Sequence, residues 1–340
     1  MICVLSMKDV TNNDVTDFYM ETIYMGCNSV EQTNWFTWDN LPPKDSQVIV
    51  STIIEAIRLI IIGYKKVGLW IQGILPEESY LKHHSNVRKA VLELIEKYVL
   101  RRANILFIVS KEMEQHYRIK YNIDIAEKTV IMPCFNTMIT EETFANRSRY
   151  GKHIFCYAGS LAPWQCFDDT IKLYAKLEKQ FDDCELRVFT RETTEAERKC
   201  SGKLAHYSIK SCSNEELQDE LRNVTFGFII RSDIEVNRVA TPTKISSYLG
   251  NGVIPIYTSC LKGFSEAARG KKCVCEMQST KDWESLWEFI NNMNEADEIE
   301  KAIKDIYFEY YNREKYIQDI KRAINRLGEN KHNKEQNKYG

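Results

Sequence analysis

The stretch RVATPTKISSYLGNGVIPIY (238–257) places a lysine where a helix is expected to begin. Thr241 is a good N-cap residue, and Pro242 fits the first helical position, where no amide donor is lost. Lys244 then falls in the first turn, although a cation there opposes the positive end of the helix dipole. A lysine in this position is explained if an anion lies between its ammonium group and the free backbone amides.

Two arginines add positive charge at the same edge of the predicted domain. Arg231 follows an apolar run, and Arg238 lies in the loop before the helix. Open α/β sheets bind ligands at the carboxyl ends of their parallel strands. The pattern therefore predicts a phosphate site at the mouth of this helix. The alternative is a surface lysine beside a well-capped helix.

Short apolar runs alternate with amphipathic stretches along the chain, which is typical of parallel α/β domains. In the first half we expect strands at 2–7, 34–40, 46–51, 67–73, 104–110 and 129–134, and helices at 52–63, 85–102 and 111–121. In the second half we expect strands at 153–159, 185–190, 206–212, 225–232, 253–257 and 271–277, and helices near 167–179, after Ser213 and from 242. Ser110 and Ser213 are expected N-caps.

The alternating pattern restarts after residue 152, which predicts two Rossmann-like domains. The polar stretch 135–152 is interpreted as the linker, and the domains are placed at 1–148 and 149–304. Residues 299–327 predict one long helix, of which 305–327 lies beyond the second domain. The polar end of the chain, 328–340, is interpreted as a frayed tail.

Composition excludes several classes of protein. Hydrophobic residues make up 44% and charged residues 28% of 340 positions, which is the globular range. Lys plus Arg (46) nearly balances Asp plus Glu (48), so a nucleic-acid partner is not expected. The N-terminus lacks the pattern of a signal peptide, and the most apolar run carries Glu55 and Arg58. We therefore expect a cytoplasmic protein.

The cysteines and histidines do not predict a metal site. Eleven cysteines are scattered without a CxxC pair, which favours free buried thiols. His83 and His84 are adjacent but have no third ligand at suitable spacing.

Four segments, taken in order, resemble family 4-like glycosyltransferases of the GT-B fold. WIQGILPEES (70–79) is similar to an acceptor-domain segment, and RRANILFIVSKEMEQHY followed by TVIMPC is similar to the stretch that closes that domain. YAGSLAPWQ (157–165) resembles the first strand and loop of the donor domain. PTKISSYLGNGVIPIY resembles the family segment P-T-K-x-x-E-Y-L-x-x-G-x-P-V-I. The resemblance implies two Rossmann-like domains facing each other across a cleft, with a C-terminal helix crossing back to the N-terminal domain.

The resemblance also implies an activity. The family transfers a sugar from a nucleotide-sugar, here expected to be UDP-linked, usually with retention and without a metal or other cofactor. The expected acceptor is a saccharide or a lipid-linked saccharide in bacterial cell-surface or capsular polysaccharide synthesis. Peripheral contact with the inner face of the membrane is left open. The alternative is a catalytically silent GT-B-like binding protein.

On the donor side, the resemblance implies that Lys244 and Arg231 hold the diphosphate and stabilise it as it leaves. The backbone at Gly159 and Ser160 would approach the same phosphates, and Arg191 is a further cation. The other donor-side positions are Pro242, Thr243 and Ser247.

The sequence departs from the family where donor-binding glutamates are usual. Ser247 and Val239 occupy the two positions of the E-x7-E motif, and Glu235 is a candidate replacement. Ser160 and Gln165 stand where an arginine and a lysine are common. These departures keep the silent alternative open.

On the acceptor side, the resemblance points to Gln72, Gly73, Glu77 and Glu78. If the enzyme inverts, Glu78 is a candidate general base. If it retains, the leaving phosphate can accept the acceptor's proton. The simpler interpretation of both glutamates is a capping role, because acidic residues are favoured before a helix.

One helical stretch has a further interpretation. Residues 82–102 are basic at both ends and carry an apolar stripe. This pattern suits either a helix that faces a membrane or one that packs on the sheet.

Overall fold

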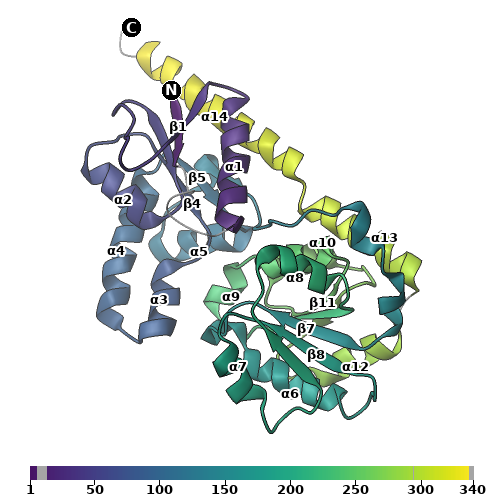
Figure 1. Cartoon of the computed structure of the whole chain (residues 1–340). Coiled ribbons are helices and arrows are strands. Elements are labelled where there is room, and N and C mark those ends of the chain that lie inside the picture. The colour runs from purple at the N-terminus through teal and green to yellow at the C-terminus, as the bar shows by residue number, and fades with distance from the viewer. Residues whose placement is uncertain (6–13, 294, 337–340) are drawn as a thin grey trace. The chain divides into compact units, whose positions relative to one another are not determined.

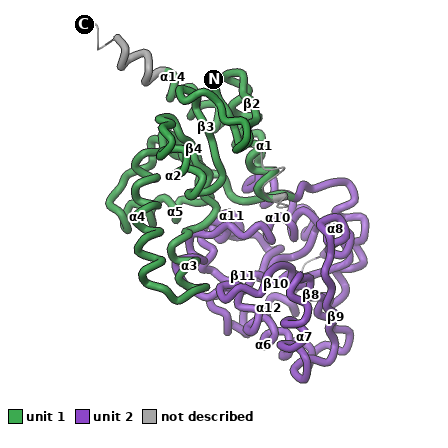
Figure 2. The backbone as a smooth tube through the Cα atoms, turned by 60° about the vertical axis from the view of Figure 1, so that its left-hand side comes forward, with its two compact units in different colours: residues 1–136, 312–340 green, residues 137–311 purple. Residues whose placement is uncertain are grey.

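The computed structural model describes residues 1–5, 14–293 and 295–336 and divides them between two compact units (Figure 2). Unit 1 holds residues 1–136 and the chain from 312 onward, and unit 2 holds 137–311. The end of the predicted first strand, residues 6 and 7, lies outside the described residues.

Unit 1 is built on a fully parallel six-stranded sheet with the strand order β2-β1-β3-β4-β5-β6 (Figure 1). Its strands are β1 (Ile2–Leu5), β2 (Thr33–Phe36), β3 (Gln47–Val50), β4 (Val67–Ile71), β5 (Ile105–Ile108) and β6 (Thr129–Ile131). Its helices are α1 (Asp14–Asn28), α2 (Ile53–Ile61), α3 (Leu75–His83), α4 (Asn86–Arg102), α5 (Lys111–Tyr121) and α14 (Arg313–Gln336), with a 3-10 turn η1 (Ala126–Lys128). Helices α1 and α3 were not predicted.

Unit 2 repeats the architecture with the strand order β12-β11-β10-β7-β8-β9, again all parallel. Its strands are β7 (Ile154–Ala158), β8 (Glu185–Phe189), β9 (Tyr207–Lys210), β10 (Phe226–Ile229), β11 (Ile254–Thr258) and β12 (Cys275–Met277). Its α-helices are α6 (Phe167–Leu177), α7 (Thr193–Cys200), α8 (Asn214–Leu221), α9 (Glu235–Val239), α10 (Thr243–Gly250), α11 (Lys262–Ala268), α12 (Trp283–Asn291) and α13 (Ala296–Tyr310). Three 3-10 turns complete it: η2 (Glu141–Phe144), η3 (Arg147–Gly151) and η4 (Pro163–Gln165).

Local capping explains where several helices begin. The predicted N-caps Ser110 and Ser213 are confirmed, because their hydroxyls accept the backbone N–H groups of Met113 and Glu216. Glu216 returns a bond to the backbone of Ser213, which completes a capping box.

The predicted long helix 299–327 is in fact two helices. The break falls at Tyr311 and Asn312, where Tyr311 is buried and the Asn312 side chain accepts the Lys315 N–H at 3.0 Å. Asn312 therefore caps the start of α14, and the chain changes unit there.

Helix α14 returns to the N-terminal unit and packs along α1, as the fold prediction required (Figure 1). The two helices approach closely at Gly26, where an added Cβ would lie 2.7 Å from the Cβ of Ile320. Two Rossmann-like parallel sheets with this returning helix confirm the predicted fold class.

The division between the units lies at 136/137, earlier than the predicted boundary at 148/149, and the return lies at 311/312 rather than 304/305. The reason is that the supposed linker is anchored in unit 2. The Arg149 side chain is buried and donates to the carbonyl oxygens of Leu221, Arg222 and Thr143 at 3.2, 2.8 and 3.0 Å. At the other end, α13 packs against α10 and α11 and so belongs to unit 2.

Two further features bear on class and location. All eleven cysteines are free thiols, as predicted, and most are buried. Within the described part of the chain, every helix is too short or too polar to cross a membrane.

Substituting Arg149→Met should destabilise unit 2 by about 3 kcal/mol, because several buried carbonyl oxygens lose their donor. Urea unfolding followed by circular dichroism measures this change. Arg147→Met is the matched control, since Arg147 forms an exposed ion pair with Asp297 and its loss should barely move the midpoint. Equal midpoints for the two variants would contradict the anchoring role of Arg149.

Candidate functional site

The candidate site lies where the strand order of unit 2 reverses direction. After β7 the chain adds β8 and β9 on one side, and β10 then returns to the other side of β7. Open α/β sheets bind ligands at such a switch point, outside the carboxyl ends of the strands. Gly159 directly follows β7, and Arg231 lies just beyond β10.

The structure brings the predicted residues Gly159 and Lys244 into contact. Gly159 has a φ of +129°, a conformation that side chains with a Cβ rarely adopt. A Cβ added there would lie 2.6 Å from Cε and 3.0 Å from Nζ of Lys244. The lysine stem therefore lies directly against the backbone of the loop after β7, in space that only glycine leaves free.

Lys244 is held over an aromatic ring instead of a carboxylate. Its Nζ lies 3.9 Å from the ring centroid of Tyr157. Burial, and then the positive charge of Arg231, lower the pKa of Lys244 well below its ordinary value. A negatively charged ligand would therefore stabilise the protonated form of Lys244.

Arg231 is the second cation of the site and is only 5% exposed. Its Nη1 donates to the backbone oxygen of Trp164 at 3.0 Å, whereas its Nε is buried without a partner. Burial lowers the pKa of Arg231. Among the side chains that the structure describes, no carboxylate pairs with either Arg231 or Lys244. Two positive charges thus share one site without a counter-charge.

The loop after β7 is held by contacts that the sequence did not reveal. Glu192 accepts the Leu161 N–H at 2.7 Å, and the Tyr157 hydroxyl donates to the Ser160 oxygen at 2.5 Å. Glu192 stands directly after Arg191, in a position that carries no recognisable pattern. Tyr157 did stand inside the quoted segment YAGSLAPWQ, and its contact with Lys244 became visible only in three dimensions.

Tyr248, one helical turn after Lys244, attaches helix α10 to the sheet. Its hydroxyl accepts the Ala158 N–H at 3.1 Å, so α10 is tied to the end of β7. The ring lies over Gly227 of β10, where an added Cβ would be 2.3 Å from Cε2 of Tyr248. This packing fixes α10, and Lys244 with it, against both strands of the switch point.

The predicted start of the helix needs one correction. Helix α10 begins at Thr243, and Pro242 is its N-cap, with φ −61° and ψ 124°, without a side-chain capping bond. Thr241 is therefore not the N-cap, because the extended ψ of Pro242 keeps the chain out of the helix for one more residue. Lys244 remains in the first turn, packed against Gly159 and Tyr157.

The other predicted donor-side residues are more exposed than Arg231 or make only local contacts. Ser160 and Arg191 are exposed, while Pro242 and Thr243 are partly exposed. The Ser247 hydroxyl donates to the Thr243 oxygen at 3.3 Å.

The residues near the positions of the absent E-x7-E glutamates make contacts within unit 2 instead. Val239 is buried in the core. Arg238 is neutralised by Asp233, with bonds of 2.6 and 3.1 Å, and Glu235 lies 3.7 Å from the same guanidinium. Arg238 therefore adds less charge to the site than the sequence suggested.

In unit 1, the predicted acceptor-side residues form a separate cluster at the start of α3. A Cβ on Gly73 would lie 2.0 Å from Oε1 of Glu78, so this carboxyl group lies against the backbone of Gly73. Burial raises the pKa of Glu78, which Lys82 opposes and Glu77 reinforces. Gln72 is exposed next to them.

Glu77 differs from Glu78 because it is already engaged within unit 1. Its Oε1 accepts from Lys120 at 2.7 Å and lies 3.7 Å from Lys89. These ion pairs tie α3 to α4 and α5. Both glutamates lie in the first turn of α3, where they also suit the helix dipole.

A cavity of about 280 Å³ adjoins Arg231 at the carboxyl ends of β10, β11 and β12. Its lining includes the polar residues Asp233, Ser259, Lys262 and Gln278. It therefore extends the candidate site along the same edge of the sheet.

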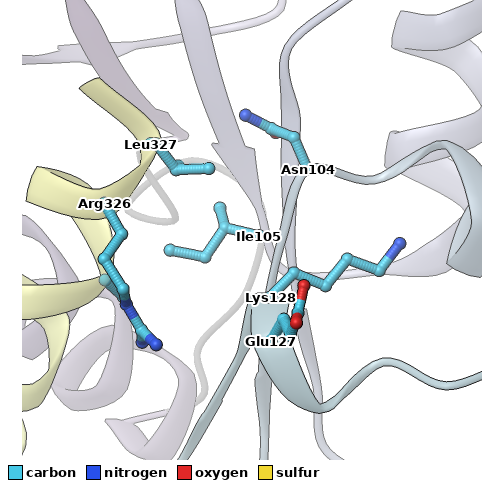
Figure 3. Close-up of a pocket in the computed structure, with 7 residues that line it drawn as sticks. Asn104, Ile105, Glu127, Lys128, Arg326 and Leu327 are labelled. Carbon is cyan, nitrogen blue, oxygen red and sulfur yellow. The ribbon is translucent and has the colours of Figure 1, made fainter. Parts of the chain in front are cut away.

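A second cavity, of about 360 Å³, lies in unit 1 beside α14 (Figure 3). Ile105 is the first residue of β5, and Glu127 and Lys128 directly precede β6. This cavity is thus at the amino ends of the strands, the edge that open α/β sheets do not use for ligands.

The two parallel six-stranded sheets and the returning helix α14 define a GT-B fold, and solved structures share this architecture. No protein-family model matches the sequence, and no curated protein matches it. Sucrose-phosphate synthase from Thermosynechococcus elongatus superposes with a TM-score of 0.69 at 10% identity, covering 96% of this chain and 98% of that one.

Two further solved structures share this fold. WaaG, a glycosyltransferase involved in lipopolysaccharide biosynthesis, matches with a TM-score of 0.62 at 12% identity, covering 94% of this chain and 99% of that one. S. aureus TarM, in complex with fondaparinux, α-GlcNAc-glycerol and UDP, matches with a TM-score of 0.60 at 11% identity, covering 83% of this chain. The chain spans 56% of the TarM chain. The resemblance to GT-B glycosyltransferases is confirmed in the fold.

Anion binding should be coupled to proton uptake at Lys244. A bound anion raises the lowered pKa of Lys244, so affinity for sulfate should fall as the pH rises from that lowered value toward about 10.4. Sulfate does not itself titrate in this range. Calorimetry in two buffers of different ionisation enthalpy measures the uptake.

Lys244→Met should abolish this proton uptake and weaken sulfate binding by about tenfold or more. Lys172→Met is the control, because Lys172 forms an exposed ion pair with Asp169 on α6. Undiminished proton uptake in Lys244→Met would contradict the assignment.

Proposed function

We propose that this protein is a glycosyltransferase that uses a nucleotide-sugar, with UDP as the expected nucleotide. The observation that carries the proposal is the pair of cations, Lys244 and Arg231, without a counter-charge at the switch point of unit 2. A nucleotide diphosphate supplies the missing negative charge. The UDP in the TarM complex and the shared fold support this choice.

The donor diphosphate is proposed to lie between the Lys244 ammonium group and the backbone of Gly159 and Ser160. In this proposal Arg231 adds its positive charge beside the diphosphate. Arg191, which follows the neighbouring strand β8, is proposed to contact the nucleotide. The polar cavity next to Arg231 offers room for the sugar. Negative charge grows on the diphosphate as it leaves, so cations fixed in advance stabilise the transition state more than the ground state.

Retention is the proposed stereochemistry. The bond from the sugar C1 to the diphosphate oxygen breaks, and the bond from C1 to the acceptor oxygen forms on the same face. The acceptor's proton passes to the departing phosphate oxygen. In this scheme Lys244 and Arg231 supply the charge stabilisation that a metal ion provides in other transferases.

The acceptor is proposed to meet unit 1 near Gln72, Gly73 and Glu78. Because Glu78 has no ion pair among the residues that the structure describes, its carboxyl group is available to a sugar hydroxyl. Glu77 contributes by fixing α3 through Lys120. A saccharide or lipid-linked saccharide of cell-surface or capsular polysaccharide synthesis is the proposed acceptor, with hexosyl transfer in the bacterial cytoplasm.

A catalytically silent binding protein is the second candidate. Ser247 and the buried Val239 favour it, because neither can replace the carboxylates that usually hold the donor. The cation pair opposes it. A buried arginine beside a lysine whose charge is also disfavoured destabilises a fold, and a protein that binds no anion gains nothing from keeping the two together.

Nucleoside diphosphates should stabilise the protein in a thermal-shift series of UDP, GDP and dTDP, to which the monophosphate CMP is added. A ligand at about a hundred times its dissociation constant adds roughly 2.7 kcal/mol to the folded state. We expect UDP to produce the largest shift and Lys244→Ala to remove it, with Lys172→Ala as the unaffected control. If folded wild-type protein shows no shift with any nucleotide, the donor proposal fails.

Glu78→Gln separates the two stereochemical mechanisms. Under retention we expect kcat to fall by less than about tenfold, because no protein base is required. NMR of the product should show the donor's anomeric configuration. A loss of about a hundredfold or more, together with an inverted product, would instead identify Glu78 as a general base.

A further inference from the structure

Helix α4 of unit 1 exposes a continuous apolar stripe. Val87, Val91, Leu94 and Tyr98 are 77%, 51%, 70% and 48% exposed. Their spacings of four, three and four residues place them on one side of the helix. At 1.5 Å per residue this stripe is about 16 Å long. Large apolar side chains aligned in this way mark an interaction surface more often than isolated ones do.

Basic residues frame the stripe, and acidic residues are excluded from it. The exposed positions of α4, all of them described, include Arg88, Arg101 and Arg102 but no Asp or Glu. Arg101 and Arg102 follow Tyr98 by three and four residues and continue the same face. The outer face of α4 is therefore apolar along its middle and cationic at its end.

The two glutamates of α4 lie on the opposite side, where they hold the helix in place. Glu96 is buried and accepts from the Tyr121 hydroxyl at 2.5 Å, and Lys120 lies 3.5 Å from Glu96 and 3.2 Å from Glu93. The apolar stripe thus faces outward because the polar side is committed to α5. In Figures 1 and 2, α4 borders unit 1 beside α2 and α3.

Helix α2, which packs against α4, adds exposed apolar side chains of its own. Ile54 and Ile61 of α2, and Ile62 directly after it, are all exposed. The apolar surface of this part of unit 1 is therefore not confined to one helix.

We infer that the outer face of α4 binds the surface of an anionic lipid bilayer. An amphipathic helix with an apolar stripe and cationic edges lies in the plane of the interface, with the apolar side chains among the acyl chains and the basic ones at the headgroups. A convex helix suits a flat fluid surface, whereas a protein partner would have to supply a matching groove. Charge complementarity selects anionic over zwitterionic lipid.

Lipid binding goes beyond the proposed function, and it can be tested without measuring glycosyl transfer. If unit 1 also holds the acceptor, this contact would bring a lipid-linked saccharide to the enzyme, and that clause alone rests on the proposed function. Vesicle binding needs neither donor nor acceptor. Failure here and failure of nucleotide binding are therefore distinguishable.

The test is co-sedimentation of the full chain with vesicles of phosphatidylcholine, alone or with about one-third phosphatidylglycerol. We expect binding to the anionic vesicles to be about tenfold or more tighter and to weaken with salt. Leu94→Ser with Tyr98→Ser should reduce it by about tenfold. Phe308→Ser is the matched control, because Phe308 is an exposed apolar residue of α13 in unit 2.

Arg101→Ser with Arg102→Ser should weaken binding and flatten its salt dependence. Circular dichroism should show that all variants remain folded, since every substituted side chain points outward. No binding by the wild type, equal binding to both kinds of vesicle, or unchanged binding by the Leu94 and Tyr98 double variant would overturn the inference. A lipid-free dimer that this double variant dissociates would assign the face to a second copy of the chain and overturn it as well.

Discussion

Two cationic side chains, Lys244 and Arg231, are held together in unit 2 without a carboxylate beside them, so that the positive charge of each is disfavoured. Burial already disfavours each charge, and their mutual repulsion adds to that cost. Folding alone gives no reason to retain such a pair. A bound anion does, and the pair lies at the reversal of strand order between β7 and β10, where this class of sheet binds ligands.

The rest of unit 2 can be understood as the support for this pair. Gly159 leaves out the side chain that would collide with Lys244, and Tyr157 places an aromatic ring under its ammonium group. Tyr248 locks α10 to β7 through Ala158 and over Gly227. These contacts fix the lysine before any ligand arrives, which is how electrostatic stabilisation of a leaving group becomes effective.

Much of this was accessible from the sequence because it depends on local pattern. Apolar runs identified the strands, and a lysine in the first turn of a helix indicated an anion. The missed features depend on long-range packing. The role of Arg149 required knowing which carbonyl oxygens lie near it, and the break at Asn312 required knowing that α13 and α14 pack on different units. Glu192 fixes the loop after β7 from the end of the neighbouring strand β8, 31 residues further along the chain, so no spacing rule could reveal it.

A crystal structure of the chain with bound UDP would test the assignment of Lys244 and Arg231 to a diphosphate. We expect a diphosphate oxygen within about 3 Å of the Lys244 Nζ, with the Gly159–Ser160 backbone and Arg231 beside it. Such a structure would show the two charges neutralised by one ligand. UDP bound elsewhere, with the Lys244 side chain still over the Tyr157 ring and no phosphate near it, would contradict the assignment of this site.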